Sequence, residues 1–238
     1  MAVSFQTMYV LAAGGERAME QLDVTANNIA NVNTPGFKKI LEEEMSQHIP
    51  QNGGDAYNLL VFPRFKATHV LLSEGALKKT GNPFDLALKG DGFFAVKTKG
   101  GEVYTRNGHF TLGADGKLVD SNGNPVLGID DREIILSGRG KVTVDKDGVI
   151  YEDGRKVAVL KVVNFRSVSP VGDSYYRGIG SPQPTDAAVL QGYLESSNVN
   201  PVKEMVELIN AQRRFEMYGN LIRGLDGLNQ RSVEIGKV

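Results

Sequence analysis

The chain has 238 residues and a formal net charge of −1, with 27 Lys and Arg against 28 Asp and Glu. This balance argues against a globally basic nucleic-acid binder, and a hydrophobic content of 41% suffices for at least one core. The sequence contains no Cys, which excludes disulfide scaffolds, thiol nucleophiles and Cys-ligated metal sites.

A helix is predicted near the N-terminus, from residue 8 to about residue 32. Its apolar and small residues recur at alternating spacings of three and four, which places them on one helical stripe. This stripe comprises Met8, Leu11, Gly15, Ala18, Leu22, Thr25, Ile29 and Val32. The helix should end at Asn33-Thr34-Pro35-Gly36, because the residue before a proline is pushed out of the α region.

The middle of the chain reads as β structure. Residues 37–81 are predicted as an irregular, partly β connector, with a Gly-rich turn at residues 52–54 and extended segments at residues 58–62 and 68–72. Residues 82–189 are predicted as an all-β domain, because dipeptides such as Asn107-Gly108 and Asp153-Gly154 favour tight antiparallel hairpins. The strands expected there are residues 84–88, 92–97, 103–106, 109–112, 117–120, 141–144, 149–152 and 157–165. Residues 167–187 contain three prolines and are predicted as a long loop.

A second helix is predicted from Pro201 to about residue 233, in a C-terminal segment covering residues 190–238. Asn198 and Asn200 are candidate caps, and Glu204 stands where a capping-box acid would be. The apolar stripe comprises Leu208, Ala211, Phe215, Tyr218, Ile222 and Leu225, and it is widened by Met205, Ile209, Leu221 and Leu228.

The two helical stripes match in period and roughly in length. They could pack on the central domain, pair with each other or pair with neighbouring subunits, and the match favours pairing. The predicted fold class is therefore α+β, with long terminal helices that pair as a coiled-coil-like stalk and a central all-β domain of antiparallel hairpins. In the free protein we expect both helices to be loose.

Motifs that could carry catalysis or bind a cofactor fail on residue identity. The glycines of residues 90–92 lack the third glycine of a dinucleotide fingerprint, and Gly140-Lys141 is followed by Val142 in place of Ser or Thr. Residues 145–148 lack the bidentate Glu of a calcium loop, and the three His are scattered singly. We expect no enzyme activity, no cofactor and no metal site.

Membrane and targeting signals are also missing from the sequence. No apolar run approaches the roughly 18 residues that a spanning helix needs. Residues 1–15 contain no Lys or Arg and hold Gln6 and Thr7 within their apolar part. We therefore expect a chain that does not span a membrane and carries no cleavable signal peptide.

Several motifs point to a family. Residues 25–38, with the sequence TANNIANVNTPGFK, resemble the N-terminal signature of the bacterial flagellar axial proteins, the rod and hook family. Residues 192–200 (GYLESSNVN), 205–209 (MVELI) and 212–216 (QRRFE) resemble the family's C-terminal block, and residues 85–94 and 104–110 match in the middle. The resemblance implies a non-catalytic, self-assembling subunit of the axial shaft that connects motor to hook. Within the family, the spacing from Gly36 to Gly90 is shorter than in distal rod proteins, and the sequence of residues 213–217 (RRFEM) also differs from theirs. The resemblance therefore favours the proximal part of the rod over the distal part.

The resemblance also implies partners and a location. The expected partners are further copies of the chain, other rod and hook axial proteins and the flagellar export apparatus, and the expected location is the rod within the cell envelope. The expected assembly interface comprises Leu11, Leu22, Asn27, Asn28, Ile29, Asn31, Met205, Leu208, Phe215, Ile222 and Leu225. The Asn amides either fix the register of packed helices or belong to a frayed helix end. A soluble β-domain binding module, which would work without the helices, is the alternative from another class.

Overall fold

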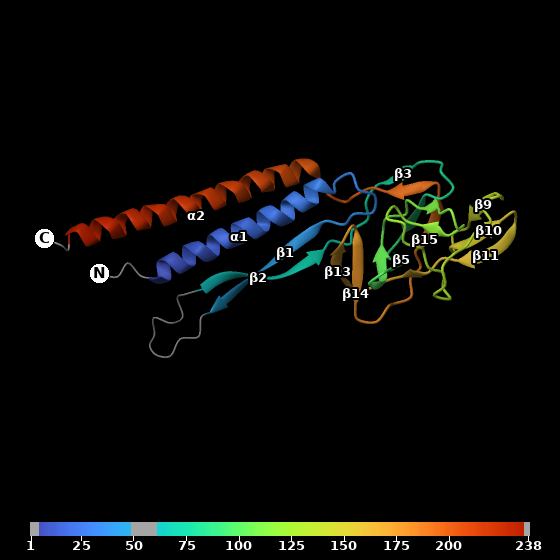
Figure 1. Ribbon diagram of the computed structural model, residues 1–238, viewed down its shortest axis with the longest axis horizontal. Coiled ribbons are helices and arrows are strands. Elements are labelled where there is room, and N and C mark those ends of the chain that lie inside the picture. Colours follow the sequence, from blue (N-terminus) through green and yellow to red (C-terminus); the bar gives the residue numbers. More distant parts are fainter. Residues whose placement is uncertain (1–4, 49–60, 236–238) are drawn as a thin grey trace. The chain divides into compact units, whose positions relative to one another are not determined.

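The computed structural model describes residues 5–48 and 61–235 (Figure 1). This part of the chain contains two helices and sixteen strands, consistent with the predicted α+β class. The chain divides into two compact units. Unit 1 comprises the described parts of residues 1–30, 40–68 and 200–238, and unit 2 comprises residues 31–39 and 69–199. The turn predicted at residues 52–54 and the first part of the segment 58–62 lie outside the described residues.

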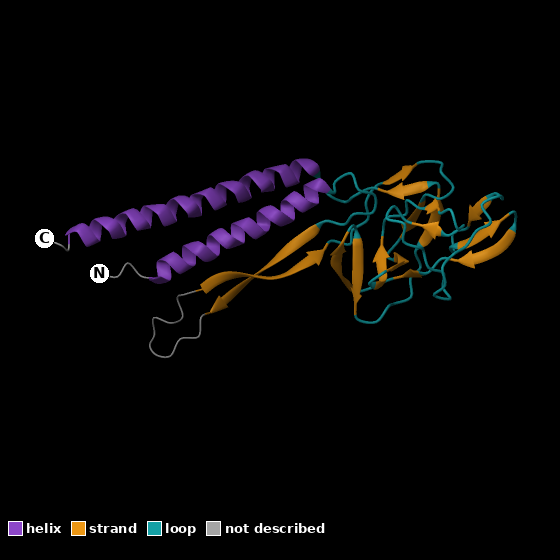
Figure 2. Ribbon diagram, viewed as in Figure 1, coloured by secondary structure: helices purple, strands orange, loops and turns teal. Residues whose placement is uncertain are grey.

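Unit 1 is built on the two terminal helices, which lie side by side in Figures 1 and 2. Helix α1 spans Phe5–Ala30 and helix α2 spans Pro201–Ile235, which confirms both predicted helices. The helices run antiparallel: Gly14 lies against Tyr218, and Asn28, fourteen residues further along α1, bonds to Glu204, fourteen residues earlier in α2.

Unit 1 also contains most of a two-stranded sheet. Strands β1 (Ile40–His48) and β2 (Val61–Val70) form a two-stranded sheet, and β1 contacts α1. Long paired strands therefore occupy much of the segment that the sequence predicts as an irregular, partly β connector.

Unit 2 consists of antiparallel strands (Figure 2). The largest sheet has five strands in the order β12-β5-β6-β14-β13, and a three-stranded sheet has the order β11-β10-β9. Two-stranded pairs are β15-β4, β16-β3 and β7-β8. The strands are β3 (Leu77–Lys79), β4 (Leu86–Lys89), β5 (Phe93–Thr98), β6 (Gly101–Thr105), β7 (Thr111–Leu112), β8 (Leu118–Val119), β9 (Val142–Val144), β10 (Val149–Glu152), β11 (Arg155–Val159), β12 (Val162–Val163), β13 (Ser167–Gly172), β14 (Tyr175–Ile179), β15 (Ala188–Gln191) and β16 (Tyr193–Glu195).

The main core of unit 2 is formed by side chains from these strands and from the segments between them. Phe94 and Phe110 are fully buried and meet edge to face, with ring centroids 5.3 Å apart. Leu88, Ile134 and Ile150 pack in the same cluster. Each such side chain contributes roughly 1.5–3 kcal/mol through burial.

Two predictions about unit 2 are wrong. The expected loop at residues 167–187 begins with the hairpin β13–β14, whose turn carries positive φ angles at Asp173 and Ser174. Pro170 is tolerated because it lies at the irregularity in the register of β13. The single strand expected at residues 157–165 is divided into β11 and β12, which belong to different sheets.

Candidate functional site

Most residues of the predicted stripe of α2 are at least half-buried, and Tyr218 packs against α1 at Gly14. Ala211 is fully buried, and four further stripe residues are half-buried, whereas the Phe215 side chain is 44% exposed. The half-buried residues are Leu208, Tyr218, Ile222 and Leu225. A Cβ atom on Gly14 would lie 2.4 Å from the Tyr218 ring, so the absence of a side chain at Gly14 makes room for that ring.

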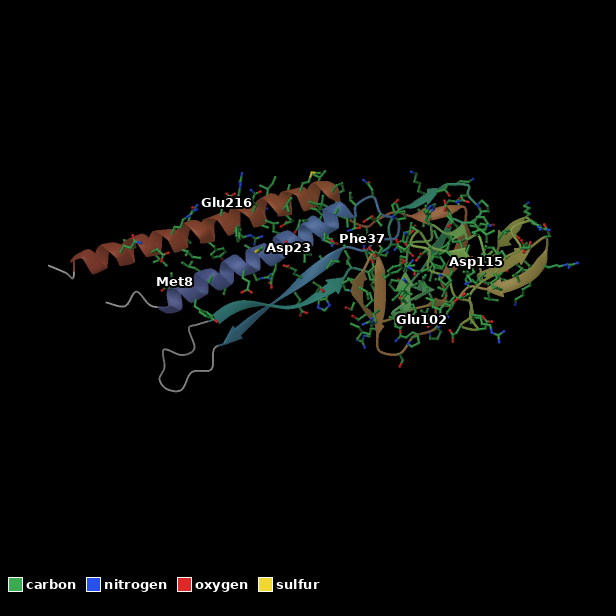
Figure 3. All side chains as sticks on the ribbon, viewed as in Figure 1. Met8, Asp23, Phe37, Glu102, Asp115 and Glu216 are labelled. Carbon is green, nitrogen blue, oxygen red and sulfur yellow. The ribbon has the colours of Figure 1, made fainter. Side chains whose placement is uncertain are left out.

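The residues that widen the stripe of α2 remain accessible. Met205, Ile209, Leu221 and Leu228 are 47–59% exposed, and Val202 is 69% exposed. Figure 3 shows the side chains of α2, Glu216 among them, projecting outward along the helix. Among the accessible residues, Val202, Met205, Val206 and Ile209 follow the spacing i, i+3, i+4, i+7 and so share one face, which gives the first turns of α2 an accessible apolar surface.

The predicted interface residues near the N-terminus differ in burial. Leu11, Leu22 and Ile29 on α1 are half-buried, and so is Asn31, which belongs to unit 2. Asn27 is exposed on α1, as are the apolar side chains of Tyr9 and Met19.

Asn28 has a structural role within the chain. Its side chain is 1% exposed; the Nδ2 group donates to the Ile40 carbonyl at 2.9 Å and to a Glu204 carboxylate oxygen at 3.3 Å. The Oδ1 atom accepts the Ile40 N–H at 2.9 Å. One buried amide thus joins α1, the start of β1 and the first turn of α2, three elements of unit 1.

The two candidate cap residues of α2 have different partners. Asn200 Oδ1 accepts the N–H groups of Val202 and Lys203, both at 3.1 Å, so Asn200 is the N-cap. The Asn198 side chain bonds instead to Lys39, Leu71 and Ser73 within unit 2.

A buried ionic cluster, which the sequence analysis missed, lies in unit 2. It comprises Lys38, Arg106 and Glu195, all 1–2% exposed. Lys38 Nζ lies 2.6 Å from Glu195 Oε1, and Arg106 Nη1 lies 3.2 Å from Glu195 Oε2. Arg106 also donates to the carbonyl of Gly90 at 2.7 Å and lies over the Phe93 ring.

The electrostatics of this cluster follow from its burial. Desolvation lowers the pKa of Lys38, although the Glu195 carboxylate opposes that change. Burial also raises the pKa of the Tyr176 hydroxyl, whose oxygen accepts the Lys38 N–H at 2.9 Å. One carboxylate with two cations is costly to disrupt, because removing Glu195 would leave both cations buried without an opposite charge.

The described residues contain no group of three or more His, Cys, Asp or Glu suited to a metal ion. An open depression beside β11 is lined by Arg132 and Glu133, but these charges are paired with Asp130 and with Lys97 and Lys117. None of the described helices is long and apolar enough to cross a membrane.

Comparisons with known proteins identify the class of protein. The family described as "Flagella basal body rod protein" matches residues 8–38, and "Flagellar hook protein FlgE/F/G D1 domain" matches residues 87–152. "Flagellar basal body rod FlgEFG protein C-terminal" matches residues 190–235. The chain therefore belongs to the flagellar basal-body rod protein family, as the sequence motifs indicated.

Individual relatives refine this assignment. The flagellar basal-body rod protein FlgF of Caulobacter vibrioides is 39% identical over 92% of this chain and 93% of its own length. FlgF of Rhizobium meliloti is 34% identical over 96% of this chain and 97% of its own length. The rod protein FlgG of Agrobacterium fabrum is 31% identical over 93% of this chain and 95% of its own length.

Proposed function

We propose that this flagellar rod subunit occupies the proximal part of the rod and assembles through the surfaces of α1 and α2. Relatives named FlgF, the proximal rod protein, are 34–39% identical to the chain, whereas those named FlgG, the distal rod protein, are 28–32% identical. The distal rod is the second candidate location, because the FlgG relatives match nearly the whole chain.

The observation that carries the assembly proposal is the accessible apolar face of α2. Met205, Val206 and Ile209 are each about half exposed although they are apolar. A neighbouring subunit that covered them would remove this surface from water, at roughly 25 cal/mol per Å² of apolar area. Repeated, heterologous contacts of this kind do not close on themselves and build a helical tube.

Within one chain, we propose that α1 and α2 pair as a coiled-coil-like stalk. The seam of α2 has spacings of three and four from Glu204 through Ala211 to Leu225, which is the heptad pattern of such pairs. The proposed assembly interface comprises Leu11, Leu22, Asn27, Asn28, Ile29, Asn31, Met205, Leu208, Phe215, Ile222 and Leu225. Its half-buried members on the two helices, such as Leu22 and Leu208, shape the seam, and the exposed Met205 and Phe215 are available to neighbours.

The remaining parts of the proposal concern cellular context. Copies of the chain leave the cytoplasm through the flagellar export apparatus and polymerise with each other and with other axial proteins in the rod, across the periplasm. The subunit acts as a building block without enzymatic activity, which accords with a family of structural proteins.

The double substitution Met205→Asp with Ile209→Asp tests this function. Both side chains are accessible, so the purified chain should keep its helix content and melting temperature. Rod assembly should fail, because each Asp would be buried without a partner, at a cost of several kcal/mol. Basal bodies are then counted by electron microscopy in cells that carry only the variant.

The matched control is Ile129→Asp, which changes an apolar residue in unit 2 that is 71% exposed. These cells should build rods and swim. Normal rods in cells carrying the Met205→Asp, Ile209→Asp double variant, present at normal abundance, would contradict the proposed interface.

A further inference from the structure

Three chain segments of unit 2 adjoin the positions where the chain passes between the units. The chain passes from one unit to the other after residues 30, 39, 68 and 199. Residues 36–39, 71–75 and 195–198, which we call the collar, lie next to three of these four positions. The collar belongs wholly to unit 2, so its bonds hold the three segments to one another within that unit.

Asn198 bonds to both other segments of the collar. Its Oδ1 atom accepts the Lys39 N–H at 2.7 Å, and its Nδ2 group donates to the carbonyls of Leu71 at 2.9 Å and Ser73 at 3.0 Å. The Leu71 N–H in turn donates to the Lys39 carbonyl at 2.8 Å. A single side chain therefore links the segment that leads to β1 with the segment that follows β2.

Glu195 provides a second set of links. Its Oε1 atom accepts the Lys38 Nζ at 2.6 Å and the Gly75 N–H at 2.8 Å, and its backbone carbonyl accepts the Gly36 N–H at 2.8 Å. Arg106, bound to Glu195 and to the Gly90 carbonyl, attaches the collar to the strands of the β core. Lys38, Arg106 and Glu195 are buried and charged. Breaking one of their ion pairs would therefore leave a charge buried without its partner, which favours opening of the links together.

We propose that the collar is the joint that carries mechanical load in the subunit and that Asn198 is its positioning residue. The inference rests on the proposed function as a rod subunit, because only a shaft that transmits rotation loads its subunits continuously. The four chain crossings join the two units covalently, so force between the units is transmitted along them. A single unbraced crossing bends at its backbone dihedrals, whereas cross-bonded crossings share the load and yield only when several bonds break together.

The variant Asn198→Ala tests the joint in cells, with Gln191→Ala as the matched control. The Gln191 side chain also makes three hydrogen bonds in unit 2, to Pro83, Val142 and Val144, but none to the collar. Both variants should assemble rods, which electron microscopy counts. Rotation is then measured with beads of increasing size attached to the flagellar stub.

We expect Asn198→Ala motors to match the control at low load and to lose torque or break severalfold more often at high load. Equal behaviour of the two variants at every load, in rods that contain the chain, would overturn the collar as a joint. Absence of the wild-type chain from the rod would instead overturn the proposed function.

Hydrogen exchange on the purified full-length chain provides a readout that does not depend on assembly. The Gly36 and Gly75 amides bond to Glu195 and do not touch the Asn198 side chain. If the collar opens as one unit, Asn198→Ala should speed exchange at both glycines by roughly tenfold or more. Unchanged exchange at both glycines would overturn the proposal, as would an equal increase in Gln191→Ala.

Discussion

Replacing Gly36 with Ala tests how closely the sequence GFK, residues 36–38, packs against the backbone of residues 106–107. Gly36 has a φ of +67°, and a Cβ atom there would lie 2.2 Å from the Arg106 carbonyl carbon and 2.3 Å from the Asn107 nitrogen. These are backbone atoms, so no change of rotamer relieves the overlap. The left-handed conformation costs about 1–2 kcal/mol for Ala, and the overlap adds roughly 1–3 kcal/mol or more. We expect a total loss of about 2–5 kcal/mol in the free energy of unfolding.

Gly81→Ala is the matched control for this prediction. Gly81 has a φ of +78°, but a Cβ atom there would meet nothing within 4 Å. It should lose only the conformational part, roughly 1–2 kcal/mol. Urea unfolding of the full-length chain, followed by tyrosine fluorescence because the chain has no Trp, measures both variants. Equal losses in the two variants would refute the close approach of Gly36 to the backbone of Arg106.

Three further predictions concern other parts of the chain. Gly14→Ala should destabilise the helix pair by about 1–3 kcal/mol, because its Cβ atom overlaps the Tyr218 ring. Adding Tyr218→Ala should relieve that overlap. Thermal melts give the stability of the two single variants and the double variant, and purely additive losses would contradict the contact. Asn28→Ala should lower the free energy of unfolding by about 1–3 kcal/mol and speed hydrogen exchange of the Ile40 amide, which donates to the Asn28 side chain. Unchanged exchange at Ile40 would contradict the role of Asn28 in joining α1 to β1. Burial raises the pKa of Tyr175 to about 12, so this hydroxyl ionises at lower pH in the unfolded chain than in the folded one, and stability falls as the pH rises above about 10. Ultraviolet titration of the folded wild type should show one tyrosine that ionises near pH 12, and this step should be missing in Tyr175→Phe. Its persistence in the variant would contradict the assignment of this pKa to Tyr175.

Local signals in the sequence were sufficient for the helices and for most of the strands. The stripe spacing of α1 and α2 depends only on residues within the same helix, and both helices are confirmed. Asp153-Gly154 predicted a tight turn, and the structure has positive φ at both residues, which is the conformation that such turns require. The hairpin β13–β14 was missed because its support comes from elsewhere: Gly178 leaves room for the ring of Phe165, which lies outside the hairpin.

The buried ionic cluster could not be predicted from local patterns. The cluster draws on three distant parts of the chain, at Lys38, Arg106 and Glu195. Each of these residue types is usually exposed at a protein surface, so none of them alone predicts a buried site. All three lie in the motifs that carry the family resemblance, which was the one available signal. Asn28 is similar: its motif was visible, but the bonds of its amide to the start of β1 depend on the folded arrangement of unit 1.

Localising the chain within purified basal bodies tests the central claim most directly. A compact tag inserted at the exposed turn Asp153-Gly154 should be tolerated, because a Cβ atom on Gly154 would meet nothing within 4 Å. In cells that swim with only the tagged chain, electron cryomicroscopy should show added density around the proximal part of the rod. Added density on the distal rod or the hook, or rods that lack the tagged chain, would contradict the account.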